Sequence, residues 1–377
     1  MMNHLKNSFI VAMVVALLLV GCGDKPKSNS YKIGAILPLT GQIGYIGEQE
    51  LVGLKLGVED INARATTNGF GIQLIPEDFA SQPTNAVTAA HKLIDIDKVD
   101  ALFVSTTSAS RAVAPIAQAA NIPLLVMSSD PEITSVSPVI YRIFMNSGVE
   151  QGLLAERLSV LGMKKVFVLY NQDRAFDAAY RELKGLLEVK GMKSVAAETF
   201  EKTQTDFRNV IQKAKQSGAD AYVFMGFGSE FPLILSQWGD KGKAHYFGNY
   251  TFGTAGAQSQ GKSLIEGIEF PTFSVKNNSP QLSGFKKRAL DMRGGKPLSD
   301  FMDHLYSYES MLFIEQCARA AKAEKSQSLL AACDKTKAFQ GLSGNITIDH
   351  NRNADVPMSL GVYRNGILQN VDESKQM

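Results

Sequence analysis

Two patterns of apolar residues alternate along the body of the chain. Short runs rich in aliphatic and β-branched residues, such as 32–37, have the length of buried strands. Longer runs place apolar residues at three- and four-residue steps, as Leu51, Leu54 and Val58 do within 48–65, which is typical of an amphipathic helix. The pattern predicts strands at 32–37, 71–78, 101–104, 122–126, 166–170, 194–200 and 221–225, and helices at 48–65, from 83 onward, and at 108–120, 177–190, 206–217 and 298–322.

This alternation of strand and helix predicts an α/β protein with parallel, doubly wound sheets. Two units of similar size follow one another, and a helical stretch and two final strands come after them. In such sheets, ligands bind at the carboxyl ends of the strands. The loops that follow the strands are therefore the first place to look for a site.

The first 21 residues have the features of a bacterial signal peptide. Lys6 supplies a positive start, and the apolar run 9–20 is too short to span a bilayer. The letters LVGC at 19–22 resemble a lipobox, in which Cys22 becomes the lipid-modified N-terminus. An uncleaved anchor is the alternative interpretation. We expect cleavage before Cys22, with residues 22–30 as a tether between a membrane and the body of the protein.

Composition and charge exclude several classes of protein. The 377 residues are 45% hydrophobic and the mean hydropathy is −0.06, which excludes a disordered chain and a polytopic membrane protein. The length predicts about two domains. The 39 Lys and Arg nearly balance the 37 Asp and Glu, and loss of Lys6 with the signal peptide leaves 38 against 37. No basic surface is indicated, so we expect no nucleic-acid partner.

Two cysteines remain in the body of the chain, and export would place them in an oxidising compartment. Cys317 and Cys333 lie in a helical region that has a polar break at 325–327. Two helices folded back on each other at this break would bring the sulfurs together, so a disulfide is possible. Two buried thiols are the alternative.

Short motifs occur in a fixed order over 31–366. They read IGAILPLTG at 33–41, VEDINA at 58–63, PIA at 115–117, NIP at 121–123, DPE at 130–132, TDF at 205–207, GAD at 218–220, GLSG at 341–344 and ID at 348–349. In this succession the chain resembles the leucine/isoleucine/valine-binding proteins. These are substrate-binding components of ABC importers with a type I periplasmic-binding fold.

The resemblance implies two doubly wound parallel-sheet lobes joined by three crossovers. We expect lobe one to comprise 31–146 plus 274–343, and lobe two 147–273 plus 344–377. The family binds its ligand between the lobes, which close on it by a hinge motion, as in a Venus flytrap.

Two hydroxyl-rich clusters follow predicted strands of the first lobe. Residues 105–108 (STTS) open the helix 108–120, where hydroxyls and free N–H groups at a helix N-terminus suit an anion. Simple helix capping is the alternative for this cluster, and Arg111 would add positive charge unless it is solvated. In the resembling family, these clusters hold the ligand's carboxylate, which implies roles for Thr107, Ser108, Ser128 and Ser129.

The remaining expected contacts are mainly aromatic. By family position Ile46 faces the cleft, with Tyr45 as the alternative if the register shifts by one residue. The family often carries an acid for the ligand's ammonium within 248–252, but this chain has GNYTF there. Glu230 would serve as that partner unless it is an ordinary surface residue. An aromatic second-lobe wall makes apolar carboxylates competitors to amino acids, and its expected members are Phe176, Phe227 and Tyr250.

The sequence gives little support for nucleotide, cofactor or metal binding, or for hydrolysis. Residues 256–263 match G-x-x-x-x-G-K-[ST], but no strand precedes them and Gly267 leaves no room for a helix, so we expect no nucleotide site. The glycine-spaced loop 41–47 does not match the dinucleotide fingerprint, so we expect no cofactor. The five histidines show no metal-ligand spacing, and no nucleophile elbow occurs. An exported hydrolase is therefore disfavoured.

The combined hypothesis is a lipid-anchored periplasmic solute-binding protein, not an enzyme, that uses no metal or cofactor. It would capture a small carboxylate, in the first place a branched-chain or other hydrophobic amino acid, and present it as a monomer to an ABC permease in the inner membrane. The alternatives are a sensor of the same fold that signals to a membrane receptor, and a binder of a non-amino apolar or aromatic carboxylate.

Overall fold

The computed structural model describes residues 29–371, apart from 255, 261, 274–278, 297–301 and 324–327. The predicted signal peptide, the predicted lipidation site Cys22 and most of the tether lie outside the described residues. Within the described part, no helix combines the length and the apolar character needed to cross a membrane.

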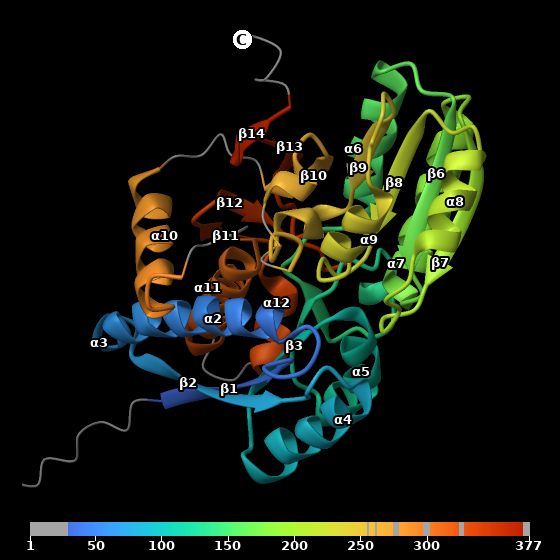
Figure 1. Cartoon of the computed structure of the whole chain (residues 1–377). Coiled ribbons are helices and arrows are strands. Elements are labelled where there is room, and N and C mark those ends of the chain that lie inside the picture. The colour runs from blue at the N-terminus through green and yellow to red at the C-terminus, as the bar shows by residue number, and fades with distance from the viewer. Residues whose placement is uncertain are drawn as a thin grey trace, which may run out of the picture.

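The first lobe is built on a five-stranded sheet in the order β2-β1-β3-β4-β5, and every pair in it is parallel. Side chains alternate between its faces: Phe103 and Leu125 belong to one core, whereas Leu102 and Val126 belong to another. Helices α2 (Gly44–Ala63) and α11 (Met302–Ala323) cover the first face, and α4 (Pro83–His91) and α5 (Thr107–Ala120) cover the second (Figure 1). Its elements are β1 (Asn29–Leu37), α2 (Gly44–Ala63), α3 (Ala65–Asn68), β2 (Phe70–Asp78), α4 (Pro83–His91), the π-helical turn η1 (Lys92–Ile96), β3 (Ala101–Ser105), α5 (Thr107–Ala120), β4 (Leu124–Met127), the 3₁₀ turn η2 (Ile133–Ser135) and β5 (Ile140–Arg142).

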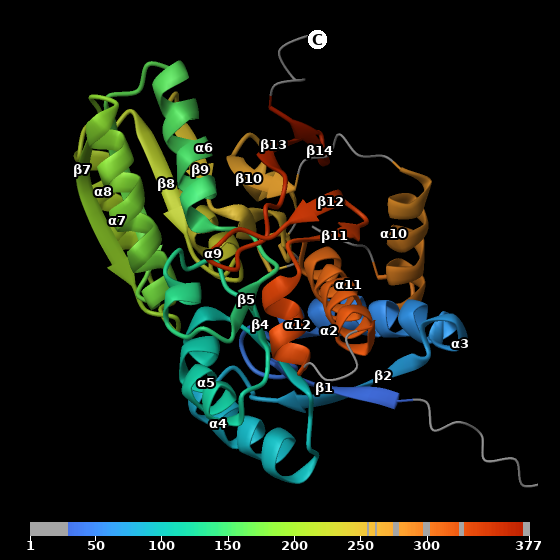
Figure 2. The same ribbon diagram turned by 180° about the vertical axis from the view of Figure 1, so that it is seen from behind.

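The second lobe has a seven-stranded sheet in the order β14-β13-β10-β9-β8-β6-β7. It is parallel from β10 to β7, and β13 and β14 pair antiparallel at its edge. One face packs against α6 and α7 and the other against α8 and α9 (Figure 2). Its elements are α6 (Ser147–Val160), β6 (Lys165–Asn171), α7 (Arg174–Val189), β7 (Lys193–Phe200), α8 (Arg208–Gln216), β8 (Ala221–Met225), α9 (Phe231–Trp238), β9 (His245–Gly248), the 3₁₀ turns η3 (Tyr250–Gly253) and η4 (Lys262–Ile265), β10 (Glu269–Phe273), β13 (Met358–Arg364) and β14 (Ile367–Asn370).

The remaining elements return to the first lobe. They are α10 (Pro280–Met292), α11 (Met302–Ala323), α12 (Leu329–Lys335), β11 (Ala338–Gly341) and β12 (Gly344–Thr347). The chain thus passes between the lobes three times, after β5, after β10 and after β12. This arrangement confirms the predicted fold class of two doubly wound parallel-sheet lobes.

The last predicted lobe boundary, at 343/344, falls inside the β11–β12 hairpin. These strands pair with each other, with Gly341 opposite Gly344. Ile346, Ala354 and Val356 all pack in the first-lobe core, because the chain stays beside the end of β5 until it leaves for β13. We therefore move this boundary from 343/344 to the segment just before β13.

Most predicted elements form within a few residues of their expected bounds, and the differences have local causes. The helix expected from 177 begins at Arg174, because the Asp173 carboxylate caps it by accepting the Ala175 N–H (2.9 Å). The strand expected over 122–126 is β4, which starts only at Leu124. The helix expected from 48 begins four residues earlier, as α2.

Helices α2 and α11 pack with almost no space between their backbones. A Cβ atom on Gly53 would lie 2.1 Å from both the carbonyl oxygen of His304 and the Oγ of Ser307. One turn further on, a Cβ on Gly57 would lie 2.7 Å from the Cβ of Met311. Glycine is therefore required at this crossing, which fixes how the residues around it face one another.

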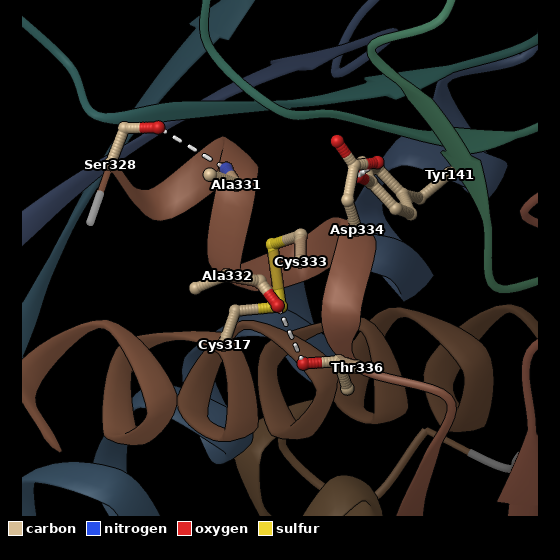
Figure 3. Close-up of a disulfide and its surroundings, with 8 residues drawn as sticks. All are labelled: Tyr141, Cys317, Ser328, Ala331, Ala332, Cys333, Asp334 and Thr336. Carbon is tan, nitrogen blue, oxygen red and sulfur yellow. Dashed lines mark hydrogen bonds between the residues drawn. A yellow bond between two sulfur atoms is a disulfide. The ribbon is translucent and has the colours of Figure 1, made fainter. Parts of the chain in front are cut away.

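Helix α12 packs against α11, and the sulfurs of Cys317 and Cys333 meet between them as a disulfide (Figure 3). Their Cα atoms are 4.8 Å apart. The Ser328 hydroxyl caps α12 by accepting the Ala331 N–H (3.2 Å), and Thr336 closes its C-terminal end by donating to the Ala332 carbonyl (3.0 Å). Short α12 is thus held at both ends and at its centre.

We expect Cys317 and Cys333 to be bridged in the exported protein. The bridge closes a loop with a sequence separation of 16, so reduction should lower the free energy of unfolding by about 3 kcal/mol. Chemical denaturation of the untreated and the reduced protein measures this loss, and a Cys317→Ala/Cys333→Ala variant, which reductant should not affect, is the control. Full alkylation of both residues in the unreduced protein would contradict the prediction.

Candidate ligand-binding cleft

A cavity with about 480 Å³ of empty space, part of it open to solvent, lies between the two lobes. Both lobes contribute to its wall, and the loops after β3, β4 and β6 meet there, as the carboxyl ends of parallel strands should. The lining residues are Ile46, Glu50, Ser105, Thr106, Thr107, Met127, Ser129, Phe144, Asp173, Ala175, Phe176, Phe227, Tyr250 and Asp303.

The hydroxyl-rich wall comes from the turn between β3 and α5. Thr106, at this turn, has φ of 67°, a left-handed conformation that is a genuine outlier for a β-branched residue. The side chain of Thr106, which occupies the N-cap position of α5, makes no capping hydrogen bond among the described residues. Capping therefore does not account for the hydroxyls of this cluster, and the strained turn points to a functional constraint.

Six of the nine residues expected at the site line the cavity: Ile46, Thr107, Ser129, Phe176, Phe227 and Tyr250. That they contact a ligand stays a prediction.

The other three residues expected at the site form hydrogen bonds elsewhere. Ser128 shares a hydrogen bond with the Thr107 hydroxyl (2.7 Å) and lies behind the wall. Ser108 donates to the carboxylate of Asp173 (3.1 Å). Tyr45 donates to the carbonyl oxygen of Phe227, so Ile46 lines the cavity and Tyr45 joins the lobes.

Two further residues differ from what their sequence positions suggested. Arg111 is neither solvated nor free for an anion, because its Nε donates to the Asp130 carboxylate (2.9 Å). Glu230 is not a surface residue: it is buried and accepts from the Asn171 amide (3.0 Å). Burial raises the pKa of the Glu230 carboxyl.

Aromatic rings form the apolar part of the cavity. Phe176 and Phe227 meet edge to face, with ring centroids 5.0 Å apart. Phe144, just before the first crossover, meets Tyr250 in the same way at 5.6 Å and also contacts Tyr306 of α11. Such pairs are stable packing arrangements. The predicted aromatic second-lobe wall is therefore present, with a first-lobe ring beside it.

Three carboxylates also line the cavity, and none was expected there: Glu50 of α2, Asp173 before α7 and Asp303 of α11. Among the described lining residues none is basic. Glu50 is only 1% exposed, and burial, together with the charge of Asp303, raises its pKa well above the usual range. Nothing in the local sequence distinguishes Glu50 or Asp303 from an ordinary helix-surface acid, because only the crossing of α2 and α11 brings them to the cleft.

Three hydrogen bonds join the lobes across the cavity rim. They run from Ser108 to Asp173, from Tyr45 to the Phe227 carbonyl, and from the Gln42 amide to the carbonyl of Lys202. The lobes are therefore in contact around the cavity, which stays partly open to solvent.

The segment 256–263, which matches G-x-x-x-x-G-K-[ST], does not form a phosphate-binding loop among its described residues. The 3₁₀ turn η3 precedes it in place of a strand, and its last two residues begin the 3₁₀ turn η4 instead of a long helix. The Lys262 ammonium donates to the Gly366 carbonyl (3.1 Å). Nor does any group of three His, Cys, Asp or Glu among the described residues have the geometry of a metal site.

Two α/β lobes in contact around a polar and aromatic cavity define a two-lobed solute-binding protein. A family model described as periplasmic binding protein matches residues 30–366, so the chain belongs to that family. Its members are extracytoplasmic solute-binding proteins and not enzymes.

Individual relatives agree with this assignment. The chain is 26% identical to Leu/Ile/Val-binding protein homolog 7 of Brucella suis, over 78% of this chain and 79% of that protein. Among solved structures, it resembles the branched-chain amino acid binding protein LivJ of Streptococcus pneumoniae in complex with isoleucine (TM-score 0.80, 23% identity, 90% of this chain and 98% of that one). A Rhodopseudomonas palustris solute-binding protein in complex with 3,4-dihydroxybenzoic acid is similar in fold (TM-score 0.79, 22% identity, 91% and 96%).

One buried acid holds a loop of the cavity wall in place. Glu150 of α6 accepts the backbone N–H of Tyr250 (2.7 Å) and so fixes the loop that carries this ring. Burial, together with the nearby Glu182, raises the pKa of Glu150 to about 8. The folded protein therefore retains a proton that the unfolded chain loses, so the contribution of Glu150 to stability falls as pH rises from its ordinary pKa to about 8.

We expect Glu150→Gln to abolish this loss of stability at high pH. The glutamine oxygen still accepts from Tyr250, and Gln151, whose Oε1 has no hydrogen-bond partner, can turn its amide to accept from the new side chain. In thermal melts, the variant should be about as stable as the wild type at pH 5, and more stable than the wild type by on the order of 2–4 kcal/mol at pH 9. Glu156→Gln, an exposed change on the same helix, is the control. Equal effects at both pH values would contradict the prediction.

Proposed function

We propose that this chain is the lipid-anchored substrate-binding component of an ABC importer, and that it captures a small amino acid between its lobes. The chain lowers no reaction barrier. It binds the ligand in the cleft, closes on it and presents the closed form to a permease, with affinity set by the difference between open and closed contacts.

The observation that carries the proposal is the composition of the cavity wall. The uncapped start of α5, with the hydroxyls of Thr107 and Ser129, suits a carboxylate. The rings of Phe176 and Phe227 suit an apolar side chain. A hydrophobic amino acid combines these two groups, and several relatives carry Leu/Ile/Val-binding names.

An aromatic carboxylate is the second candidate, since a structural neighbour is described with 3,4-dihydroxybenzoic acid bound. The cavity wall favours it less. A ligand with a negative charge and no positive one would lie near three carboxylates, with no basic lining residue among the described ones to offset them. Burial of an uncompensated charge is costly, so an amino acid is the better match.

A sensor that signals to a membrane receptor would use the same cleft. The cavity alone does not separate it from a transport protein, because both require only ligand-dependent closure. A permease and ATPase gene pair next to the gene supports transport, and a neighbouring kinase gene supports sensing. We favour transport because the names of several relatives and structural neighbours describe amino-acid or ABC-transporter binding proteins.

A thermal-shift screen of the purified protein tests the ligand class. We expect hydrophobic amino acids to raise the melting temperature, and a ligand at 100 times its dissociation constant adds about 2.7 kcal/mol of apparent stability. Keto acids and aromatic acids of the same size are the comparison set. A response to aromatic acids alone would replace the amino-acid proposal with the second candidate.

Ser129→Ala tests the carboxylate end. The Ser129 side chain lines the cavity and its hydroxyl has no hydrogen-bond partner among the described residues, so its loss should leave stability unchanged and weaken the binding of an amino-acid ligand by about tenfold. Ser135→Ala, at the exposed position of the η2 turn, is the control. Calorimetric titration measures both, and an affinity within twofold of the wild type would refute a role for Ser129 in binding.

A further inference from the structure

Of the acids around the cavity, most already have polar partners within the protein. Asp173 caps α7 through the Ala175 N–H and accepts from Ser108. Glu150 accepts from the Tyr250 backbone, and Glu230 from Asn171. These carboxylates are therefore occupied by structural hydrogen bonds.

Glu50 differs from the others. Its Oε1 accepts from Ser105 (3.0 Å), but its Oε2 has no hydrogen-bond partner among the described residues. The side chain is almost fully buried and belongs to the cavity wall. A buried, unsatisfied carboxylate oxygen is costly unless a donor reaches it. In a ligand-binding cavity, that donor is most simply the ligand.

Asp303 lies on the same side of the cavity. A Cβ atom on Gly53 would lie 2.1 Å from the carbonyl oxygen of His304, the residue after Asp303, and Glu50 lies one helical turn before Gly53. The crossing of α2 and α11 therefore brings two first-lobe carboxylates to one wall, where the charge of Asp303 acts on Glu50. Burial and the charge of Asp303 both disfavour the charged form of Glu50, and a positive group between the two carboxyls would favour it.

We propose that Glu50 and Asp303 form a cation subsite on the first lobe, which takes an ammonium group of the ligand. This rests on the proposed function and deepens it: the positive end of the ligand is held by α2 and α11 of the first lobe, not by an acid in the second-lobe loop 248–252. The ammonium donates to Oε2 of Glu50 and pairs with Asp303. It is either the α-ammonium of an amino acid or the terminal amine of a basic side chain or diamine, since the chemistry of the subsite is the same for all of them.

The test uses the purified full-length protein, with thermal shift and calorimetric titration. The probes are L-leucine, L-lysine, 1,4-diaminobutane and 4-hydroxybenzoate. Binding of leucine identifies an α-ammonium in the subsite, and binding of the diamine identifies a terminal amine. We expect at least one of the three ammonium-bearing probes to bind, and 4-hydroxybenzoate not to.

The variants are Asp303→Asn and Glu50→Gln, which keep the side-chain shape, and Glu50→Gln also keeps an acceptor for Ser105. We expect each variant to bind the ammonium-bearing probe at least tenfold more weakly than the wild type. Each should also leave the melting temperature of the ligand-free protein equal or higher, because a charge repulsion is removed. A purely structural role would lower it. Glu309→Gln, a buried acid on α11 that accepts from Ser343 away from the cavity, is the matched control and should not change affinity.

The outcomes separate the two claims. An ammonium-bearing probe that binds with affinity within twofold in both cleft variants overturns the subsite and leaves the proposed function standing. Loss of melting temperature without ligand in both variants also overturns it, because the acids are then structural. Binding of 4-hydroxybenzoate alone, or of no ammonium-bearing probe at millimolar concentration, overturns the subsite and the amino-acid proposal together.

Discussion

The contact between α2 and α11 is the constraint on which the cleft depends most. Gly53 and Gly57 let the two helices approach until side chains of one meet the backbone of the other. This packing belongs to the first-lobe core, yet it determines which residues of each helix end beside the cavity. A stability requirement, the absence of a Cβ, therefore sets the chemistry of a binding surface.

The parts of the structure that follow from local pattern could be read from the sequence. The central strands of the two sheets, such as β3 and β8, are continuous apolar runs because both their faces are buried, and helix α2 shows its apolar stripe directly. The hydroxyl cluster at the start of α5 was also visible, because it follows a strand and precedes a helix. The aromatic wall came from resemblance to a family rather than from any local signal.

What could not be read from the sequence depends on contacts between distant segments. Glu50 and Asp303 are separated by most of the chain and become neighbours only through helix packing. Arg111 was a candidate for anion binding because its partner, Asp130, lies on a different loop. The final lobe boundary was placed too early because the sequence of the β11–β12 hairpin would suit a strand pair in either lobe. Only its packing against the first-lobe core assigns it to the first lobe.

The position of Phe144 has a consequence for how the two lobes would open. This ring lies at the first crossover, between Tyr250 of one lobe and Tyr306 of the other. Points near a rotation axis move little, whereas the hydrogen bonds of Gln42 and Tyr45 lie at the rim and must separate. In the lobe opening proposed above, the contacts of Phe144 with Tyr250 and Tyr306 would therefore change less than the hydrogen bonds at the rim.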